Sequence, residues 1–192
     1  SADAAATLRV LCRLWELDPS PSVLAEIALG IGSDVPYFLG EGSAHATSRG
    51  EILTFFQLAL PQAILVVAPN IHVSTRSAYE SVTPGGHAGS DDLRTLLFQH
   101  LDRPDLLRNV LLNDFEGPLF RSHPLIGDLK NRLYESGADF CLLSGSGSAL
   151  FAIFPQEKAA MEAAGRFAPE HRVFMTRPGF VPDLTITDRR ID

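Results

Sequence analysis

In the second half of the chain, short apolar runs alternate with helical patterns in an order that is found in few folds. Residues 63–68 read AILVVA, an apolar run suited to a buried strand, and Pro69 and Asn70 end it. A turn of small residues at 144–147 separates two further strand-like runs. The predicted elements are, in chain order, a strand at Ala63–Ala68, a helix at Pro124–Ser136, strands at Asp139–Leu143 and Ala149–Phe154, a helix at Glu157–Phe167 and a closing strand at Arg172–Thr176.

The resulting order, β-α-β-β-α-β, is the split arrangement of ferredoxin-like folds. We therefore predict an α+β fold with a ferredoxin-like domain at residues 61–192. A length of 192 residues suits one large domain or one and a half smaller ones.

The first 60 residues predict two helices followed by a hairpin. Ser1 or Asp3 can cap a helix running to about Leu17, whose apolar stripe includes Leu8, Leu11, Leu14 and Trp15. The dipeptide at 20–21, Ser-Pro, is typical of the start of a second helix, which one of the glycines at 30 and 32 would end. Extended segments are expected between 43 and 55, around a turn at 48–50.

Proline chemistry marks the end of the second helix. The sequence Asp34-Val35-Pro36 cannot be the middle of a helix, because Pro36 pushes Val35 toward extended geometry.

Three further helices are predicted between residues 75 and 112. Thr75 is predicted to cap a short helix through Ser81. Two more helical patterns are found at Asp92–Leu101 and Pro104–Leu112.

Composition excludes several classes of partner and site. The net charge of -7 argues against nucleic acid, which needs a surface rich in Lys and Arg. No apolar run reaches about 18 residues, so no membrane span is expected. The two cysteines, Cys12 and Cys141, form neither a CxxC motif nor a cluster with histidines. A disulfide framework and a structural zinc site are therefore not predicted, and the cysteines suit a reducing compartment, the cytoplasm.

Two segments have residue types that suit phosphoryl chemistry. Asp34 follows a helix in the run GSDVPYF, where a fixed carboxylate could orient a hydroxyl and accept its proton, although an aspartate in a turn is more often a cap. The run Ser144-Gly145-Ser146-Gly147 could cradle an anion with its backbone N–H groups, but a plain hairpin turn favours the same residues.

Three weaker features complete the set of candidate binding-site residues. The helix start at Ser1 presents free N–H groups, which attract phosphate in some proteins and are simply capped in others. Thr75 and Tyr79 are one helical turn apart and share a face, as a cap and a core aromatic also would. The run at 113–116, Asn-Asp-Phe-Glu, is otherwise a polar helix start.

Together and in this order, these segments resemble the GHMP kinases. SADAAATL at the start is similar to the end of the family's glycine-rich loop, and Leu143–Phe154 resembles its third motif, SGSGxxxFxxF. The runs around Asp34, from Pro69 through Tyr79 and at 113–116 resemble motifs of one branch, the diphosphocytidyl-methylerythritol kinases. Members of that branch transfer the ATP γ-phosphate to the 2-hydroxyl of a cytidyl-diphosphate sugar alcohol.

The resemblance implies a role for each matching position. Asp34 is expected to be the catalytic base. Ser1, Ala2 and the run Ser144, Gly145, Ser146 and Gly147 are expected to bind the phosphates of ATP, with Mg²⁺ as the accompanying ion. Thr75 and Tyr79 are expected near the diphosphate and cytosine of the substrate, where a tyrosine ring suits stacking. No residue is expected to form a dedicated metal site, and the protein is expected to be a monomer or a weak homodimer.

The family's N-terminal motif, with its catalytic lysine, has no counterpart in this chain. The resemblance therefore implies that residues 1–60 end an ATP-binding domain, that 61–192 form the C-terminal domain, and that these 192 residues alone are inactive. Another GHMP kinase, of the mevalonate or homoserine type, is the alternative within the class, and Thr75 with Tyr79 argues against it. The alternative from another class is a non-catalytic ferredoxin-like ligand-binding module, against which Asp34 argues.

Overall fold

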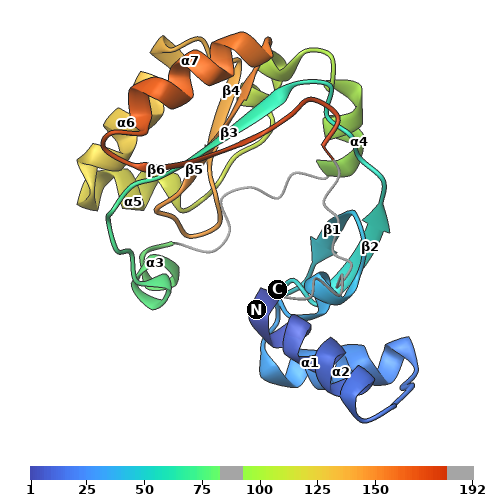
Figure 1. Ribbon diagram of the computed structural model, residues 1–192. Helices are drawn as coiled ribbons and strands as arrows, with labels where there is room; N and C mark the ends of the chain where they lie inside the picture. Colours follow the sequence, from blue (N-terminus) through green and yellow to red (C-terminus); the bar gives the residue numbers. More distant parts are fainter. Residues whose placement is uncertain (83–92, 181–192) are drawn as a thin grey trace. The chain divides into compact units, whose positions relative to one another are not determined.

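The structure of the protein is a computed structural model that describes residues 1–82 and 93–180. These residues form two compact units, residues 1–58 and residues 59–180. The smaller unit consists of helices and one hairpin, whereas the larger unit is built on a four-stranded sheet (Figure 1). Each unit has a buried apolar core of its own.

Residues 1–58 form the predicted pair of helices and the hairpin: α1 (Ala2–Leu14), α2 (Pro21–Ile31), the short 3-10 helix η1 (Pro36–Leu39), β1 (Ser43–Thr47) and β2 (Ile52–Phe56). Ser20 caps α2 as predicted, since its side chain accepts a hydrogen bond from the N–H of Val23 at 3.4 Å. The antiparallel hairpin turns through Ser48 and Gly50, which both have positive φ.

The core of this unit is small. Ala5, Ala28 and Val35 are its buried residues, and partly buried neighbours such as Leu8 pack against them. Helix α1 ends at Leu14 rather than near Leu17, and the side chains of Leu14 and Trp15 are 70% and 61% exposed. The predicted stripe is therefore wrong at Leu14 and Trp15, whereas Leu8 packs against the core as the stripe requires.

The segment between α2 and β1 contradicts one prediction. Val35 has φ -64° and ψ -40°, which is helical and not extended. Its N–H donates to the carbonyl of Gly32 and its carbonyl accepts from the N–H of Phe38, both at 3.1 Å. These turn hydrogen bonds and the burial of the Val35 side chain outweigh the steric preference imposed by Pro36. The helix nevertheless ends before Asp34, as predicted.

The larger unit contains the following elements: β3 (Ala63–Ala68), α3 (Thr75–Ser81), α4 (Leu93–Gln99), the 3-10 helix η2 (Pro104–Asn109), α5 (Glu116–Ser122), α6 (Pro124–Glu135), β4 (Phe140–Leu143), β5 (Leu150–Phe154), α7 (Glu157–Phe167) and β6 (Arg172–Thr176). The strands form one sheet in the order β4-β5-β3-β6, and each neighbouring pair is antiparallel. With α6 and α7 as the two connecting helices, this is the ferredoxin-like topology. The predicted fold class is confirmed.

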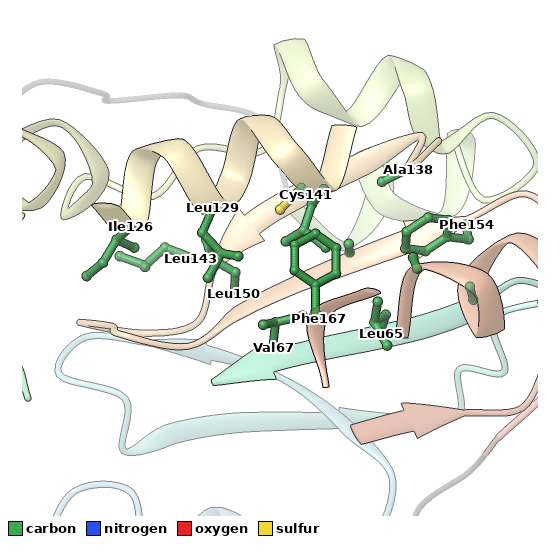
Figure 2. Close-up of a cluster of buried hydrophobic side chains, with 14 of the residues drawn as sticks. Leu65, Val67, Ile126, Leu129, Ala138, Cys141, Leu143, Leu150, Phe154 and Phe167 are labelled. Carbon is green, nitrogen blue, oxygen red and sulfur yellow. The ribbon is translucent and has the colours of Figure 1, made fainter. Parts of the chain in front are cut away.

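Alternation along the strands divides the apolar side chains between two faces of the sheet. Cys141 and Leu143 of β4 point to one face, whereas Phe140 belongs to a separate cluster with Leu107 and Ile153. Helices α6 and α7 cover the first face (Figure 1). Figure 2 shows the side chains that meet in this core, among them Leu65, Val67, Ile126, Leu129, Cys141, Leu143, Leu150, Phe154 and Phe167.

Helix α7 shows why the sequence favours this packing. Ala160, Ala163 and Phe167 recur at helical spacing and are at most 1% exposed, so α7 buries one face against the sheet. Glu157 in the first turn and Arg166 in the last complement the helix dipole. The bounds of α7, β3 and β6 agree with the predicted ones.

Three local predictions need correction. Ser74, and not Thr75, caps α3, since its hydroxyl accepts from the N–H of Ser77 at 3.4 Å. The segment after Pro104 is a 3-10 helix and ends earlier than predicted, at Asn109. Helix α5 begins at Glu116, where the run at 113–116 offered a polar helix start as the alternative, but no helix was predicted from there because Gly117 and Pro118 stand in its first turn. Asp92, the predicted start of the helix now seen as α4, lies outside the described residues.

Candidate functional site

In the smaller unit, Asp34 lies in the turn that joins α2 to η1. Its side chain is exposed, while the adjacent Val35 and Pro36 are buried and hold the turn in place. A Cβ atom on Gly50 would lie 3.9 Å from Oδ1 of Asp34, so the hairpin turn passes beside the carboxylate. The result is a carboxylate on a fixed backbone and open to solvent, which can accept a proton from a bound hydroxyl.

The hairpin turn beside Asp34 is held by Glu51. The Glu51 carboxylate accepts from the Ser48 hydroxyl at 3.0 Å and from the backbone N–H of Arg49 at 2.8 Å. Backbone and side-chain hydrogen bonds lower the pKa of Glu51, so the carboxylate stays ionised and keeps its donors in place. The Arg49 side chain extends from the same turn and is 82% exposed. The turn that passes beside Asp34 therefore also carries an exposed cation.

Ser1 and Ala2 stand at the start of α1, where both are exposed. Ser1 is the N-cap residue, and its side chain makes no capping hydrogen bond. Asp3 lies in the first turn and complements the helix dipole itself, which opposes binding of a further anion there. An ATP role for Ser1 and Ala2 stays a prediction.

In the larger unit, the predicted phosphate turn joins β4 to β5. Gly145 and Gly147 have φ of 57° and 92°, and such positive φ angles favour glycine. A Cβ atom on Gly145 would meet nothing within 4 Å, whereas one on Gly147 would lie 2.8 Å from Cδ2 of Leu119. One side of the turn is thus open to a ligand, and the other is packed against α5.

The turn is brought to the start of α3. The hydroxyl groups of Ser146 and Thr75 are 3.5 Å apart, and the Ser148 hydroxyl donates to the carbonyl of Ile71 at 2.7 Å. The first contact joins a residue predicted to serve ATP with one predicted to serve the substrate. Thr75 is exposed and Ser146 is half-buried, and hydroxyls at this distance could contact one phosphorylated ligand together.

Tyr79 lies one turn farther along α3 and is 66% exposed. Its ring contacts Phe115 edge to face, with 4.9 Å between the ring centroids and an angle of 77°. This exposure excludes the alternative that Tyr79 is a core aromatic. The ring is supported by Phe115 and available to a planar ligand.

Asn113 is a residue that the prediction of site residues missed. Its side-chain amide donates to the carbonyl of Leu143 at 3.0 Å and to that of Gly145 at 2.8 Å, so it holds the turn at 144–147 directly. The Asn-Asp-Phe-Glu run, already noticed in the sequence, was the signal for it. Only the fold shows that this run lies against the turn.

Glu116 and Lys130 form a second support for the same backbone. Lys130 Nζ lies 2.7 Å from each carboxylate oxygen of Glu116, and one of these oxygens accepts from the N–H of Leu143 at 3.0 Å. Both charged side chains are only 17% exposed. Lys130 gave no signal in the sequence, since a lysine on a helix is usually a solvated surface residue.

Within residues 1–82 and 93–180, no group of three or more His, Cys, Asp or Glu side chains could hold a metal ion. In the same part of the chain, no helix is both long enough and apolar enough to cross a membrane.

Residues 96–171 match the family described as GHMP kinases C terminal. The chain is 41% identical over 182 residues to a protein of Chlorobaculum parvum named 4-diphosphocytidyl-2-C-methyl-D-erythritol kinase, and the match covers 94% of this chain and 64% of that protein. The chain therefore spans about two-thirds, and not the whole, of the relatives that it matches.

Solved structures show the same relationship. The structure titled as that of 4-(cytidine 5'-diphospho)-2C-methyl-D-erythritol kinase is 31% identical, with a TM-score of 0.71 over 90% of this chain and 62% of that chain. A homoserine kinase from Cytophaga hutchinsonii has a TM-score of 0.60 at 17% identity, covers 91% of this chain and 63% of that chain, and shares the fold alone. Residues 96–171 therefore match the C-terminal domain of the GHMP kinases, and over most of its length this chain is similar to proteins of that family in sequence and fold.

Proposed function

We propose that the full-length protein uses ATP to phosphorylate the 2-hydroxyl of 4-diphosphocytidyl-2-C-methyl-D-erythritol, a step of isoprenoid biosynthesis. The observation that carries this proposal is the 41% identity, over 94% of this chain, to a relative with that name. The geometry adds support, since the branch motifs of the sequence supply the contacts around the turn at 144–147.

Asp34 is the proposed catalytic base. Phosphoryl transfer needs a group that orients the attacking hydroxyl and takes up its proton. The Asp34 carboxylate is exposed to a bound substrate, while Val35 and Pro36 fix its backbone. These features suit a base whose orientation is set before the substrate binds.

Ser144, Gly145, Ser146 and Gly147 are proposed to bind the phosphates of ATP. A contact with ATP is also proposed for Ser1 and Ala2, on the resemblance of the chain's start to the end of the family's glycine-rich loop. The turn fits this role because the space beside Gly145 is open and the backbone there can approach a ligand closely. ATP supplies the phosphoryl group. The residues of this chain contribute backbone and hydroxyl donors that orient it.

Mg²⁺ is proposed to accompany ATP. In proteins this ion is usually held by one or two carboxylates together with substrate phosphates and water, and not by a cage of side chains.

Thr75 and Tyr79 are proposed to bind the cytidyl-diphosphate part of the substrate. The Thr75 hydroxyl can donate to a phosphate oxygen, and the exposed Tyr79 ring can stack on a pyrimidine. Residues 1–60 are proposed to end the ATP-binding domain, and residues 61–192 to form the C-terminal domain. We further propose that the protein acts in the cytoplasm as a monomer or weak homodimer on this small-molecule substrate.

A substrate comparison tests the proposal. The full-length protein is incubated with ATP, Mg²⁺ and one of three acceptors: the cytidyl-diphosphate sugar alcohol, mevalonate or homoserine. Phosphorus NMR of the products should show a new phosphomonoester only with the first acceptor. A product with mevalonate or homoserine would assign the protein to another GHMP activity, and binding without any product would favour the ligand-binding module.

A further inference from the structure

Three side chains of the segment from Asn113 to Leu119, spaced three residues apart, contact the turn at 144–147 or Leu143, the strand residue directly before it. The Asn113 amide donates to two carbonyls of the turn region, those of Leu143 and Gly145. The side-chain oxygen of Asn113, Oδ1, accepts from the backbone N–H of Phe115 at 3.0 Å, which fixes the orientation of the side-chain amide. Asn113 is therefore a rigid donor that spans the first half of the turn.

Glu116 and Leu119 hold the same turn at two further points. Glu116 accepts the N–H of Leu143, so the Leu143 peptide groups are held on both sides by side chains of one segment. Leu119 packs beneath Gly147, where a Cβ atom would come within 2.8 Å of it. Lys130 of α6 lies 2.7 Å from both carboxylate oxygens of Glu116 and orients this acceptor.

A turn with two glycines at positive φ loses much conformational freedom when a ligand orders it. Supports that order the turn beforehand reduce this cost of binding. Because the space beside Gly145 is open, the ligand side of the turn is left free while the opposite side carries these supports.

We propose that Asn113 and Glu116 are positioning residues that hold the turn at 144–147 in the conformation that binds the phosphates of ATP, with Lys130 orienting Glu116. The inference rests on the proposed function, because it takes ATP as the ligand of this turn. A purely structural role predicts something different: loss of these contacts would lower thermal stability and leave the affinity for ATP unchanged.

Two substitutions of Glu116 separate the roles in the full-length enzyme. E116A removes the acceptor of the Leu143 N–H, and we expect KM for ATP to rise about tenfold. E116Q keeps one amide oxygen as acceptor but loses the ion pair, so it should lower thermal stability while recovering most of the ATP affinity. KM values are measured at a temperature where every variant is folded.

Asn113 offers an independent test. N113D keeps the acceptor for Phe115 but turns an oxygen toward the carbonyls of Leu143 and Gly145. KM for ATP should rise at least as much as in N113A, about tenfold. E170Q is the matched control, since Glu170 pairs with Arg132 of α6 at the surface, 3.3 Å apart. It should leave KM for ATP unchanged.

The outcomes are distinct. If E116A and N113D lose stability with unchanged KM for ATP, or if E116Q is as impaired as E116A, the positioning role is overturned while the proposed function stands. If the unsubstituted protein neither binds nor uses ATP, the proposed function fails and this inference fails with it. A rise in KM for ATP in E116A and N113D, with recovery in E116Q and no change in E170Q, supports it.

Discussion

The two compact units differ in how much apolar surface they bury. In residues 59–180, the core includes large side chains such as Phe154 and Phe167, which are at most 1% exposed. In residues 1–58, the core cluster buries only two alanines and Val35, with Pro36 buried beside them, while Leu14 and Trp15 are mostly exposed. Because burial of apolar area is the main stabilising term in folding, we expect the smaller unit to open more readily.

The comparison extends to function. The larger unit supports its candidate residues with a packed sheet, the Glu116–Lys130 pair and the Asn113 amide. The smaller unit presents Asp34 on a short turn whose support is Val35 and Pro36. Binding and stability are therefore expected to depend mainly on the larger unit, and the chemical step on a surface residue of the smaller one.

The largest expected difference between the units concerns cysteine labelling. Burial raises the pKa of Cys141 to about 12, against a partial opposing effect of Lys130, so its thiol stays protonated and inaccessible at pH 8. Cys12 of α1 is half-buried. We expect iodoacetamide to label Cys141 at least ~10³ times more slowly than Cys12, because reaction requires the larger unit to open.

Mass spectrometry of digested samples measures both labelling rates, and equal rates would contradict the comparison.

The raised pKa of Cys141 also predicts how the stability of the larger unit depends on pH. The folded state keeps the Cys141 proton where the unfolded chain releases it, so stability should be full below pH 9 and fall as pH rises toward 12.

The next effect is catalytic. Asp34→Asn in the full-length enzyme should lower kcat about 10²–10⁴-fold, since the amide cannot accept the proton. KM and the melting temperature should change little, because the side chain is exposed and the amide keeps its shape. Steady-state kinetics and thermal unfolding measure these quantities, with Glu26→Gln on α2 as the control. A kcat near that of the unsubstituted enzyme would leave Asp34 a turn residue only.

Core truncation compares the units directly. Phe154→Ala should lower the free energy of unfolding of the larger unit by about 3–5 kcal/mol, the usual result for a fully buried phenylalanine. Val35→Ala in the smaller unit removes two methyl groups and should cost about 1–2 kcal/mol. Urea denaturation followed by circular dichroism gives both values. Equal losses would mean that the smaller unit depends on its core as strongly as the larger one.

Tyr79 tests binding on the larger unit. Tyr79→Ala should raise KM for the cytidyl substrate about 10–100-fold and leave KM for ATP nearly unchanged, since a base–aromatic stack is lost. Tyr79→Phe should keep most of the affinity. The melting temperature should hardly change, because the ring is 66% exposed. A marked fall in melting temperature with equal rises in both KM values would instead assign Tyr79 to the fold.

The smallest expected effect is the loss of stability when one helix N-cap is removed in each unit. Ser20 caps α2 in the smaller unit and Ser74 caps α3 in the larger one, each through a bond of 3.4 Å. Ser20→Ala and Ser74→Ala should each cost about 1 kcal/mol. Hydrogen exchange should then increase in α2 alone for the first variant and in α3 alone for the second. A single transition shifted equally by both variants would show that the units unfold together.

Local sequence determined most of the secondary structure. The bounds of β3, α7 and β6 were predicted correctly because the apolar residues of each segment follow a single periodicity, and turn-forming or charged residues mark its ends. The segment order then indicated the ferredoxin-like topology. Prediction failed where local signals conflicted, as at Pro118 inside α5 and at Val35 before Pro36.

The sequence also singled out most candidate site residues, through motifs confined to short runs. What only the tertiary structure decided is which runs meet. Thr75 and Ser146 are 71 residues apart, Asn113 and Gly145 are 32 apart, and Lys130 reaches Glu116 from the next helix. No local propensity encodes such contacts, because sheet register and helix packing bring distant backbone segments together. The polar support beneath the turn at 144–147 therefore became visible only in the folded chain.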